Sequence, residues 1–446
     1  MFAAISAARE GASVTLLEHN EKLGKKIYIT GKGRCNLTNH SRRDELLAAI
    51  SGRSKFLYSA FSQWDADDTM RFFEEAGLRL KEERGRRVFP ASDHASDVTK
   101  TLEREMRRLG ADIRLNTSVT GIVTEPDALK GEDPDRRTVS GVRIKDQHGA
   151  ETTMSADAVI VATGGLSYPS TGSTGDGYRF AADAGHQVSA LSPSLVAMDA
   201  QESWVRDLQG LTLKNVGVRF DFAGKKAYEE RVGELLFTHF GISGPAVLTA
   251  SSRLTGMLYP WGYPGHVSAK KQPEASAKPL KAEKTDVVDV IIDIKPALGE
   301  QELDKRLIRE MEEHHRQDFA NAVRSLFPKK LLPVMVSLSG IDPEKKADQI
   351  TAEERRGFAQ LIKHLTLHAT GLRGWNEAVI THGGVDTKQI DPKTMESRLV
   401  SGLYFAGEVL NVDAVTGGFN LQIAWSTGHA AGKASAAKKN TEARRQ

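Results

Sequence analysis

The densest group of residues that could carry chemistry lies near the C-terminus, between a short apolar strand at 403–406 and a helix that begins at about 419. The candidates are Gly407, Glu408, Asp413, Gly418, Phe419, Asn420 and Leu421. Glycines let a ligand approach the backbone, and the free N–H groups of a first helical turn favour negative charge. Such an environment suits the pyrimidine edge of a flavin, where negative charge accumulates on reduction. The segment therefore predicts a flavin site, although a glycine-capped helix without a ligand is the structural alternative.

A second candidate group lies close to the N-terminus. Glu18 ends a predicted strand at 14–17, a position where a carboxylate can accept both ribose hydroxyls of an adenosine. A glycine-rich loop with basic flanks follows, and its backbone could approach a phosphate or a flavin edge. The candidate residues there are Lys25, Gly33, Arg34, Cys35 and Asn36. A generic basic loop would also explain this composition, and Cys35, the one cysteine, receives no redox role because it has no partner.

A third group follows the buried strand at 158–162. Ala162, Thr163 and Gly164 form a small-residue turn there, which would let the chain leave a sheet beside an adenosine and its pyrophosphate. The later run 170–177 lacks the ending of a P-loop, so we interpret it as an Asp-containing turn into a helix at 178–185, with a phosphate role as the weaker alternative.

Three side chains could relay a proton, namely His239, His382 and Tyr168. A satisfied structural role is the alternative for each histidine, and no catalytic residue is assigned from the sequence.

The elements that would position these residues indicate an α/β protein. Residues 2–10 predict a helix with small packing residues, and the strand at 14–17 follows it, which is the second half of a dinucleotide-binding βαβ unit. Alternating strands at about 195–295 and charged helices at about 300–370 interrupt this pattern. We therefore predict a discontinuous FAD-binding Rossmann-like domain (1–190 and 372–446) with an inserted β-barrel-like plus helical domain (191–371). Residues 264–285, rich in Lys, Ala, Pro and Ser, predict a mobile loop.

Bulk composition narrows the function classes. The 61 basic and 58 acidic residues nearly cancel to a net charge of +3, which gives no footprint for nucleic acid or an anionic membrane. A single cysteine excludes an internal disulfide, and no export signal or bilayer-spanning stretch is visible. We expect a soluble, cytoplasmic protein that acts on a small molecule and needs no metal.

Six segments together resemble a known family. They are Glu18 and residues 23–39, 162–177, 236–245, 381–385 and 403–422. In this order, through nearly the whole chain, they are similar to the BaiN/YhiN family of NAD(P)/FAD-dependent oxidoreductases. The resemblance implies tightly bound FAD, with the adenosine ribose on Glu18 and a backbone contact to adenine at Val119. It also implies flavin and pyrophosphate contacts from Lys25 and residues 33–36, and ribityl and ring contacts from the C-terminal group.

The chain departs from the family at its first residue. Family members begin with a strand and a glycine-rich turn, and Met1 aligns just beyond the last of those glycines. An internal start codon chosen in error would explain the difference. A real truncation would instead remove the main backbone donors to the pyrophosphate and expose strand edges.

Three functions follow from this pattern. The first is an FAD-dependent reductase that passes hydride to an enone-like organic acceptor, with NAD(P)H or another donor reducing the flavin. The second is a flavin-dependent amine oxidase or dehydrogenase that uses oxygen. The third, of another class, is a non-catalytic remnant that no longer binds FAD.

Overall fold

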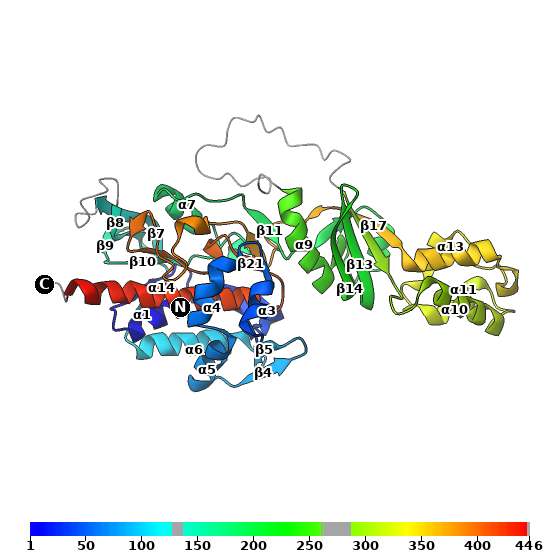
Figure 1. Ribbon diagram of the computed structural model, residues 1–446, viewed down its shortest axis with the longest axis horizontal. Coiled ribbons are helices and arrows are strands. Elements are labelled where there is room, and N and C mark those ends of the chain that lie inside the picture. Colours follow the sequence, from blue (N-terminus) through cyan, green and yellow to red (C-terminus); the bar gives the residue numbers. More distant parts are fainter. Residues whose placement is uncertain (127–136, 260–261, 263–286, 444–446) are drawn as a thin grey trace, which may run out of the picture. The chain divides into compact units, whose positions relative to one another are not determined.

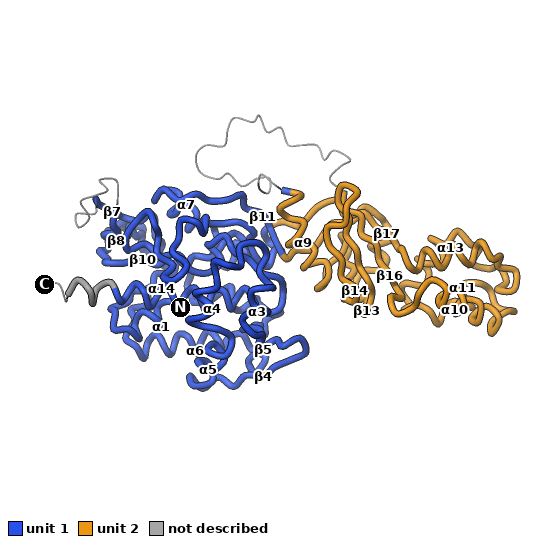
Figure 2. Tube along the Cα trace, viewed as in Figure 1, with its two compact units in different colours: residues 1–194, 259–275, 375–446 blue, residues 195–258, 276–374 orange. Residues whose placement is uncertain are grey.

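The computed structural model describes residues 1–126, 137–259, 262 and 287–443. The loop predicted at 264–285 lies outside the described residues. The chain divides into two compact units (Figure 2). Residues 1–194 and 375–446 form most of the first unit, and the second unit holds residues 195–258 and, of the later described residues, 287–374. The candidate residues of all three groups named above belong to the first unit.

The first unit contains two short parallel strand pairs, one of which includes β10 (Val159–Val161, labelled in Figure 1). β1 (Thr15–Leu17) pairs with β6 (Asp112–Arg114), and β10 (Val159–Val161) pairs with β20 (Leu403–Phe405). β10 and β20 are far apart in the sequence but pair in parallel. Because the two strands run in the same direction, the turn after β10 and the segment after β20 begin at the same end of the pair.

The long C-terminal helix α14 (Phe419–Ala443) packs along this unit and against α1 (Phe2–Arg9). Small residues allow the close approach: a Cβ at Gly432 would lie 2.3 Å from the carbonyl oxygen of Ala3. The small-residue face that the sequence predicts for residues 2–10 is therefore a helix–helix contact.

Smaller sheets and helices complete the first unit. The remaining strands are β2 (Thr38–Asn39), β3 (Ile50–Ser51), β4 (Leu80–Glu83), β5 (Arg87–Pro90), β7 (Ser118–Pro126), β8 (Arg137–Lys145), β9 (Glu151–Ser155), β11 (Ser192–Ser194), β18 (Ile380–His382), β19 (Val400–Ser401) and β21 (Asp413–Ala414). The helices are α2 (Lys25–Ile29), α3 (Arg43–Ala48), α4 (Tyr58–Gln63), α5 (Ala66–Glu75), α6 (Ala95–Arg108) and α7 (Asp176–Asp183). β18 pairs with β11, and β21 pairs with β3.

The second unit contains a closed six-stranded barrel in the order β12-β15-β14-β13-β16-β17. Its strands are β12 (Met198–Ala200), β13 (Thr212–Phe222), β14 (Lys225–Phe237), β15 (Gly241–Ser243), β16 (Val288–Asp293) and β17 (Leu365–Leu372). Alternate residues such as Val288, Val290 and Ile292 are buried, the period-two pattern of a strand with one face on a core. The predicted β-barrel-like insertion is thus confirmed.

Helices accompany the barrel: α8 (Trp204–Asp207), α9 (Pro245–Leu258), α10 (Glu300–Glu313), α11 (Phe319–Ala322), α12 (Leu332–Ser339) and α13 (Ala352–Lys363). One boundary differs from the sequence expectation: the sequence predicts helices up to about residue 370, whereas β17 begins at Leu365. Leu365, Leu367 and Ala369 are buried at every second position, so they complete the barrel rather than extend α13.

Candidate functional site

The first part of the candidate site is a carboxylate held by three partners. Oε1 of Glu408 accepts hydrogen bonds from the hydroxyl of Ser167 at 2.7 Å and from the backbone N–H of Thr381 at 2.8 Å. Oε2 lies 3.6 Å from Nζ of Lys26, which also donates to the carbonyl of Ser167 at 2.9 Å. These contacts tie together the segments that follow β10 and β20 and the strand β18. Glu408 therefore fixes the geometry of the strand ends at which the predicted cofactor would lie.

The cation of this network is Lys26, whereas the sequence pointed to its neighbour Lys25. Nζ of Lys25 instead pairs with Glu21, four residues earlier, at 2.7 Å. Two adjacent residues on a helix point about 100° apart, so only one of the two lysines can face the network. The doubled lysine was the sequence signal for a cation here, and the tertiary structure selects which of the two faces Glu408.

The second part is the start of α14, which lies against the glycine-rich loop. A Cβ at Gly418 would lie 2.4 Å from the carbonyl oxygen of Thr38 and 3.0 Å from Oδ1 of Asn36, and Gly418 has a φ of +99°. Thr38 also donates from its hydroxyl to Oε1 of Gln422 at 2.6 Å. Two segments almost 400 residues apart therefore meet with no room for a side chain between them.

Asn420 closes the loop that leads into α14. Its Oδ1 accepts from the backbone N–H of Ala414 at 2.9 Å, and its Nδ2 donates to the carbonyl of the same residue at 2.8 Å. Phe419 and Leu421 are directed toward two different hydrophobic clusters of the first unit. Gly407 has a φ of +76° and donates its N–H to the hydroxyl of Thr427 at 3.0 Å.

Two buried acceptor atoms in this region have no partner among the residues that the structure describes. They are Oδ1 of Asn36 and Oδ2 of Asp413. Burying a polar atom without a hydrogen bond costs about 1–3 kcal/mol, so such atoms usually mark a missing partner. FAD offers donors of the required kind in its ribityl hydroxyls and its ring N–H. The unpartnered acceptors, and the tight backbone cradle at Gly418, fit the cofactor that the sequence predicts.

Asp413 also forms a pair with His382. Nδ1 of His382 lies 3.0 Å from Oδ1 of Asp413, and the side chain of Asp413 is 3% exposed while that of His382 is 31% exposed. Burial lowers the pKa of His382, but the hydrogen bond and the charge of Asp413 together raise that pKa above its ordinary value. The pair joins β18 to β21.

Two of the adenosine-side candidates, Glu18 and the turn at 162–164, directly follow the parallel strands β1 and β10. Oε1 of Glu18 accepts from the backbone N–H and the side-chain amide of Asn20, at 2.9 and 2.8 Å, just beyond β1. After β10, the turn at Ala162, Thr163 and Gly164 faces the start of α7, because a Cβ at Gly177 would lie 2.1 Å from the hydroxyl of Thr163. Val119 lies in β7, opposite Ile144 of β8.

Two residues of the glycine-rich loop have protein partners of their own. The Arg34 guanidinium pairs with Glu83 and, at 2.6 Å, with Asp93, and it lies over the ring of Phe89. Cys35 is fully buried, and its burial raises the pKa of the thiol to about 12. Arg34 therefore anchors the loop to the β4–β5 hairpin, and Cys35 is a neutral core thiol. Gly33, between the helix and this pair, has a φ of +85°.

The remaining proton-relay candidates differ in their surroundings. Tyr168 has a φ of +51°, and Nζ of Lys26 lies 5.9 Å from the centre of its ring. Burial and the charge of Glu377 raise the pKa of Tyr168. His239 belongs to the second unit, where its ring contacts Phe240 edge-on.

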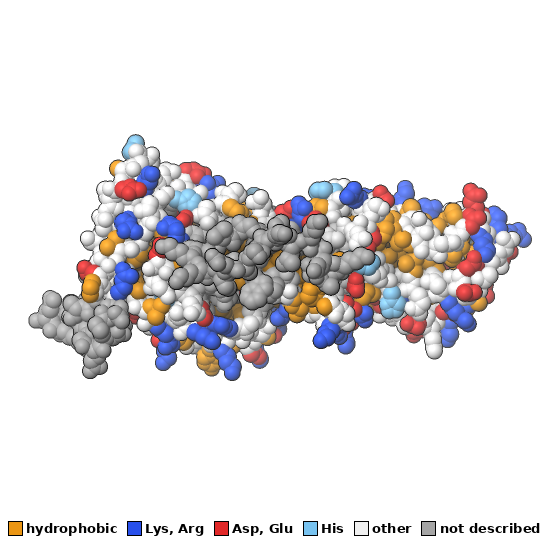
Figure 3. Space-filling view, turned by 90° about the horizontal axis from the view of Figure 1, so that it is seen from above, with side chains coloured by type: hydrophobic (Ala, Val, Ile, Leu, Met, Phe, Trp, Pro, Cys, Tyr) orange, Lys and Arg blue, Asp and Glu red, His pale blue; other side chains and the backbone are white. Residues whose placement is uncertain are grey.

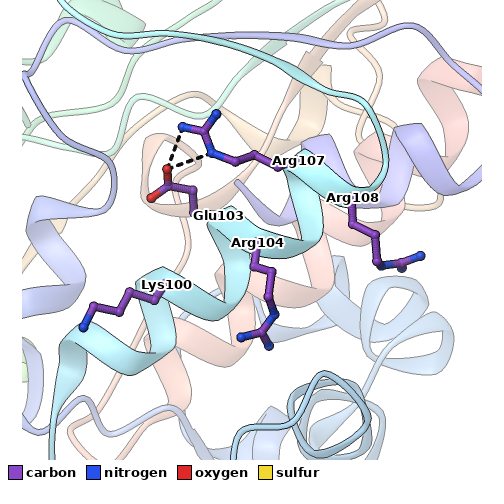
Figure 4. Close-up of a pocket in the computed structure, with 5 residues that line it drawn as sticks. All are labelled: Lys100, Glu103, Arg104, Arg107 and Arg108. Atoms are coloured by element: carbon purple, nitrogen blue, oxygen red, sulfur yellow. Dashed lines mark hydrogen bonds and ion pairs between the residues drawn. The ribbon is translucent and has the colours of Figure 1, made fainter.

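Surface charge is mixed. Figure 3 shows basic and acidic side chains interspersed over the face in view. A shallow depression along α6 is lined by Lys100, Glu103, Arg104, Arg107 and Arg108 (Figure 4). Arg107 forms a two-pronged hydrogen bond with Glu103, at 3.0 and 2.8 Å, so part of this charge is already paired.

The described residues hold neither a metal site that we assign nor a helix suited to a membrane. Glu310, Glu313 and His314 at the end of α10 have ligand atoms within 4.8 Å of one another, but Glu310 already bonds Arg306 and Ser325, and we assign no metal. In the described part of the chain, no helix combines the length and the apolar character that crossing a membrane requires.

Comparison with known proteins gives the family. Residues 1–434 match the model of the HI0933-like protein Rossmann domain. The chain is 32% identical to a 3-dehydro-bile acid delta(4,6)-reductase of Clostridium scindens, over 97% of this chain and 96% of the relative. It is 31% identical to a ribosomal RNA dihydrouridine synthase of Haemophilus influenzae, over 96% of this chain and 94% of the relative. A ribosomal RNA dihydrouridine synthase of Escherichia coli is 28% identical, over 96% and 93%.

Two solved structures share the fold. A 3-ketosteroid-delta4-(5alpha)-dehydrogenase of Rhodococcus jostii has a TM-score of 0.50 at 15% identity, covering 98% of this chain and 94% of that one. A 3-ketosteroid delta1-dehydrogenase of Sterolibacterium denitrificans has a TM-score of 0.50 at 14% identity, covering 98% and 97%. The predicted Rossmann-like fold and the predicted resemblance are both confirmed: the chain belongs to the HI0933-like Rossmann-domain family, and it is a flavoprotein oxidoreductase.

Proposed function

We propose that the protein uses FAD to reduce a carbon–carbon double bond that is conjugated with a carbonyl group, with NAD(P)H as the electron donor. The proposal rests on one observation: the names of this protein's relatives describe reactions on the same kind of double bond. A delta(4,6) double-bond system beside a 3-oxo group is a conjugated enone. The C5–C6 double bond that is saturated in dihydrouridine is conjugated with the C4 carbonyl of uracil. One reaction type therefore describes both kinds of acceptor.

The residues of the first unit support this use of FAD. Glu18 would hold the adenosine ribose, and the loop at 33–36 with the start of α14 would hold the ribityl chain and ring. Val119 and the turn at 162–164 would lie on the adenosine side. When bound, FAD supplies the two-electron chemistry that protein side chains lack.

The chain's own contribution would be position and charge. The first turn of α14 offers free N–H groups and the positive end of the helix dipole, which stabilise negative charge beside them. Glu408, Lys26 and Ser167 hold the adjoining strand ends in one arrangement. A cradle fixed in this way requires little reorganisation during the reaction.

A free small-molecule enone is the acceptor that we favour, in keeping with the balanced charge of the chain. The second candidate acceptor is a uracil ring within RNA, which the names of two relatives support at nearly the same identity. Phosphates could contact the basic side chains of the depression along α6, which are Lys100, Arg104, Arg107 and Arg108. Two of these already have acidic partners, since Arg107 pairs with Glu103 and Arg108 with Glu105.

The test uses purified protein under anaerobic conditions. Its visible spectrum reports bound flavin, and NADH or NADPH is added to bleach it. The reduced protein is then mixed with a 3-oxo-Δ4 steroid or with uridine-containing ribosomal RNA. In a parallel arm, oxidised protein is mixed with an amine and then exposed to oxygen. Reoxidation of the flavin together with a product that has gained two hydrogens supports the proposal and identifies the acceptor class. Protein without flavin, or reoxidation by oxygen alone after amine oxidation, would instead favour one of the two other functions predicted from the sequence.

A further inference from the structure

His382 and Asp413 form a pair whose two members differ in exposure. Asp413 is almost completely buried on β21, while His382, on β18, keeps about a third of its side chain accessible. A buried carboxylate that accepts a hydrogen bond from one ring nitrogen fixes the tautomer and the orientation of the ring. Because Nδ1 of His382 lies 3.0 Å from Asp413, the ring nitrogen left for other chemistry is Nε2.

Nε2 of His382 has no hydrogen-bond partner among the described residues, since the imidazole ring makes its polar contact there through Nδ1. Buried histidines with a structural role usually bond through the ring to neighbouring protein groups. His186 bonds the hydroxyl of Ser397 through Nε2 at 2.8 Å, and its Nδ1 is buried without a partner in the described part of the chain. His382 is instead anchored at one nitrogen and accessible at the other.

The surroundings of the pair are those of the candidate cofactor cradle. Asp413 immediately precedes Ala414. Asn420, in the first turn of α14, forms two hydrogen bonds with the backbone of Ala414. Thr381, the residue before His382, donates its N–H to Glu408. His382 thus lies between the two parts of the site, the Glu408 network and the loop into α14.

Among the described residues, the elements paired with β18 and β21 place the following groups near His382. Asp413 is the partner on β21, and Ser51, opposite Asp413 on β3, is uncharged. On the side of β18, the next charges are Glu408 and its partner Lys26, which oppose one another. Ser192, opposite His382 on β11, is also uncharged. Asp413 therefore provides the negative charge that stabilises a protonated ring.

We propose that His382 donates the proton to the α carbon of the conjugated acceptor, and that Asp413 is the positioning residue that orients and charges its ring. The proposal rests on the proposed function. It assigns a catalytic residue where the sequence left the choice open among His239, His382 and Tyr168.

Hydride addition to the β carbon forms one C–H bond, and the electron pair of the double bond moves to the α carbon and carbonyl as an enolate. The Nε2–H bond of the His382 imidazolium then breaks, a C–H bond forms at the α carbon, and the ring becomes neutral imidazole. The two electrons and the β hydrogen derive from NAD(P)H through the flavin, and solvent restores the proton on His382.

The experiment compares His382→Gln and Asp413→Asn with the control His40→Gln. His40 also pairs with carboxylates, Glu82 and Asp67, but on the exposed surface and outside the site. Flavin content is measured first by absorption. Rapid mixing then gives two separate rates, reduction of the protein by NAD(P)H and its reoxidation by the acceptor that the wild type uses. In parallel, NMR of ¹⁵N-labelled histidine rings gives the pKa of His382 without acceptor.

We expect His382→Gln to lower the reoxidation rate about 10²- to 10⁴-fold, the usual contribution of a general acid. Reduction by NAD(P)H should change less than about threefold, well below that range. In the wild type, the reoxidation rate should fall as the pH rises through the pKa of His382 measured by NMR, and His382→Gln should lose this dependence. Asp413→Asn should lower that pKa and move the pH profile by the same amount, while His40→Gln should match the wild type.

Two results would overturn the assignment: a His382→Gln variant whose reoxidation rate is unchanged, or one in which both rates fall together, as expected of a structural residue. A pKa of His382 that does not respond to Asp413→Asn would also overturn it. Failure of the proposed function is distinguishable, because the wild type itself would then fail to reduce either kind of acceptor.

Discussion

The contact between α14 and the glycine-rich loop allows a sharp test of the cradle. Gly418→Ala introduces a methyl group 2.4 Å from the carbonyl oxygen of Thr38. That oxygen would have to retreat by about 0.9 Å to reach an ordinary C···O contact of about 3.3 Å. A backbone oxygen cannot rotate away as a side chain can, so the cost falls on the loop that carries Asn36.

Gly52 provides the matched control. Its φ is +100°, against +99° for Gly418, but a Cβ at Gly52 would have no atom within 4 Å. Both alanine variants therefore bear the strain of a positive φ, on the order of 1–3 kcal/mol. Only Gly418→Ala adds the clash, which overpacking data place at about 1–3 kcal/mol. The difference between the two variants isolates the close approach from the strain.

The assay is thermal unfolding followed by circular dichroism, with and without added FAD, because a ligand that binds the folded chain raises Tm by mass action. For a domain of this size, 1 kcal/mol shifts Tm by about 2–4 °C, so Gly418→Ala should melt about 2–12 °C below Gly52→Ala. Flavin retention should fall in Gly418→Ala and not in Gly52→Ala. Equal melting temperatures would refute the reasoning, since they would show that the two segments do not meet at Gly418.

Three further predictions concern buried groups. Burial raises the pKa of the Cys35 thiol to about 12, so Cys35 should resist iodoacetamide in the native protein at pH 8 and react after denaturation. Mass spectrometry that finds Cys35 alkylated in the native protein would contradict its burial. Because Asp413 raises the folded-state pKa of His382, the stabilisation is complete below the unfolded pKa of about 6.5 and is lost as pH rises through the folded value. Urea unfolding at several pH values should show this loss in the wild type and not in Asp413→Asn. Gly432→Ala should lower the free energy of unfolding by about 1–3 kcal/mol, because its methyl group would clash at the α1–α14 contact. Gly357→Ala, in open space within α13, should raise the free energy of unfolding by up to about 1 kcal/mol. Equal melting temperatures of the two variants would contradict the close helix contact.

Much of the fold could be predicted because its signals are local. The alternation in β13 and β16 gives strands with one buried face, and the small residues of α1 predict a close helix contact. The glycines around 417–418 predicted a close backbone approach at the start of α14. The strand β17 was missed because eight residues that follow a long helical region give a short signal, and closure of the barrel decides their conformation.

The candidate site was predictable as a set of segments and not as a set of contacts. The sequence marked Lys25 as a candidate, but packing turned its neighbour Lys26 toward Glu408. It marked Arg34 as a donor to a ligand, but the β4–β5 hairpin supplies Glu83 and Asp93, which lie far along the chain. Whether each of these predicted cofactor contacts forms stays a prediction.

By itself the sequence determined the kind of protein: the periodicities, the glycine positions and the order of the motifs are properties of neighbouring residues, and they specify the Rossmann-like fold with its inserted barrel. Only the tertiary structure decided which polar atoms face one another. His382 and Asp413 are 31 residues apart, and no local pattern links them. Their pairing follows from the placement of β18 beside β21, and the two unpartnered acceptors, on Asn36 and Asp413, follow from burial that the whole first unit creates. Hydrogen bonds depend on distances of a few tenths of an ångström, and such distances are set by the packing of the complete core rather than by residues adjacent in the chain.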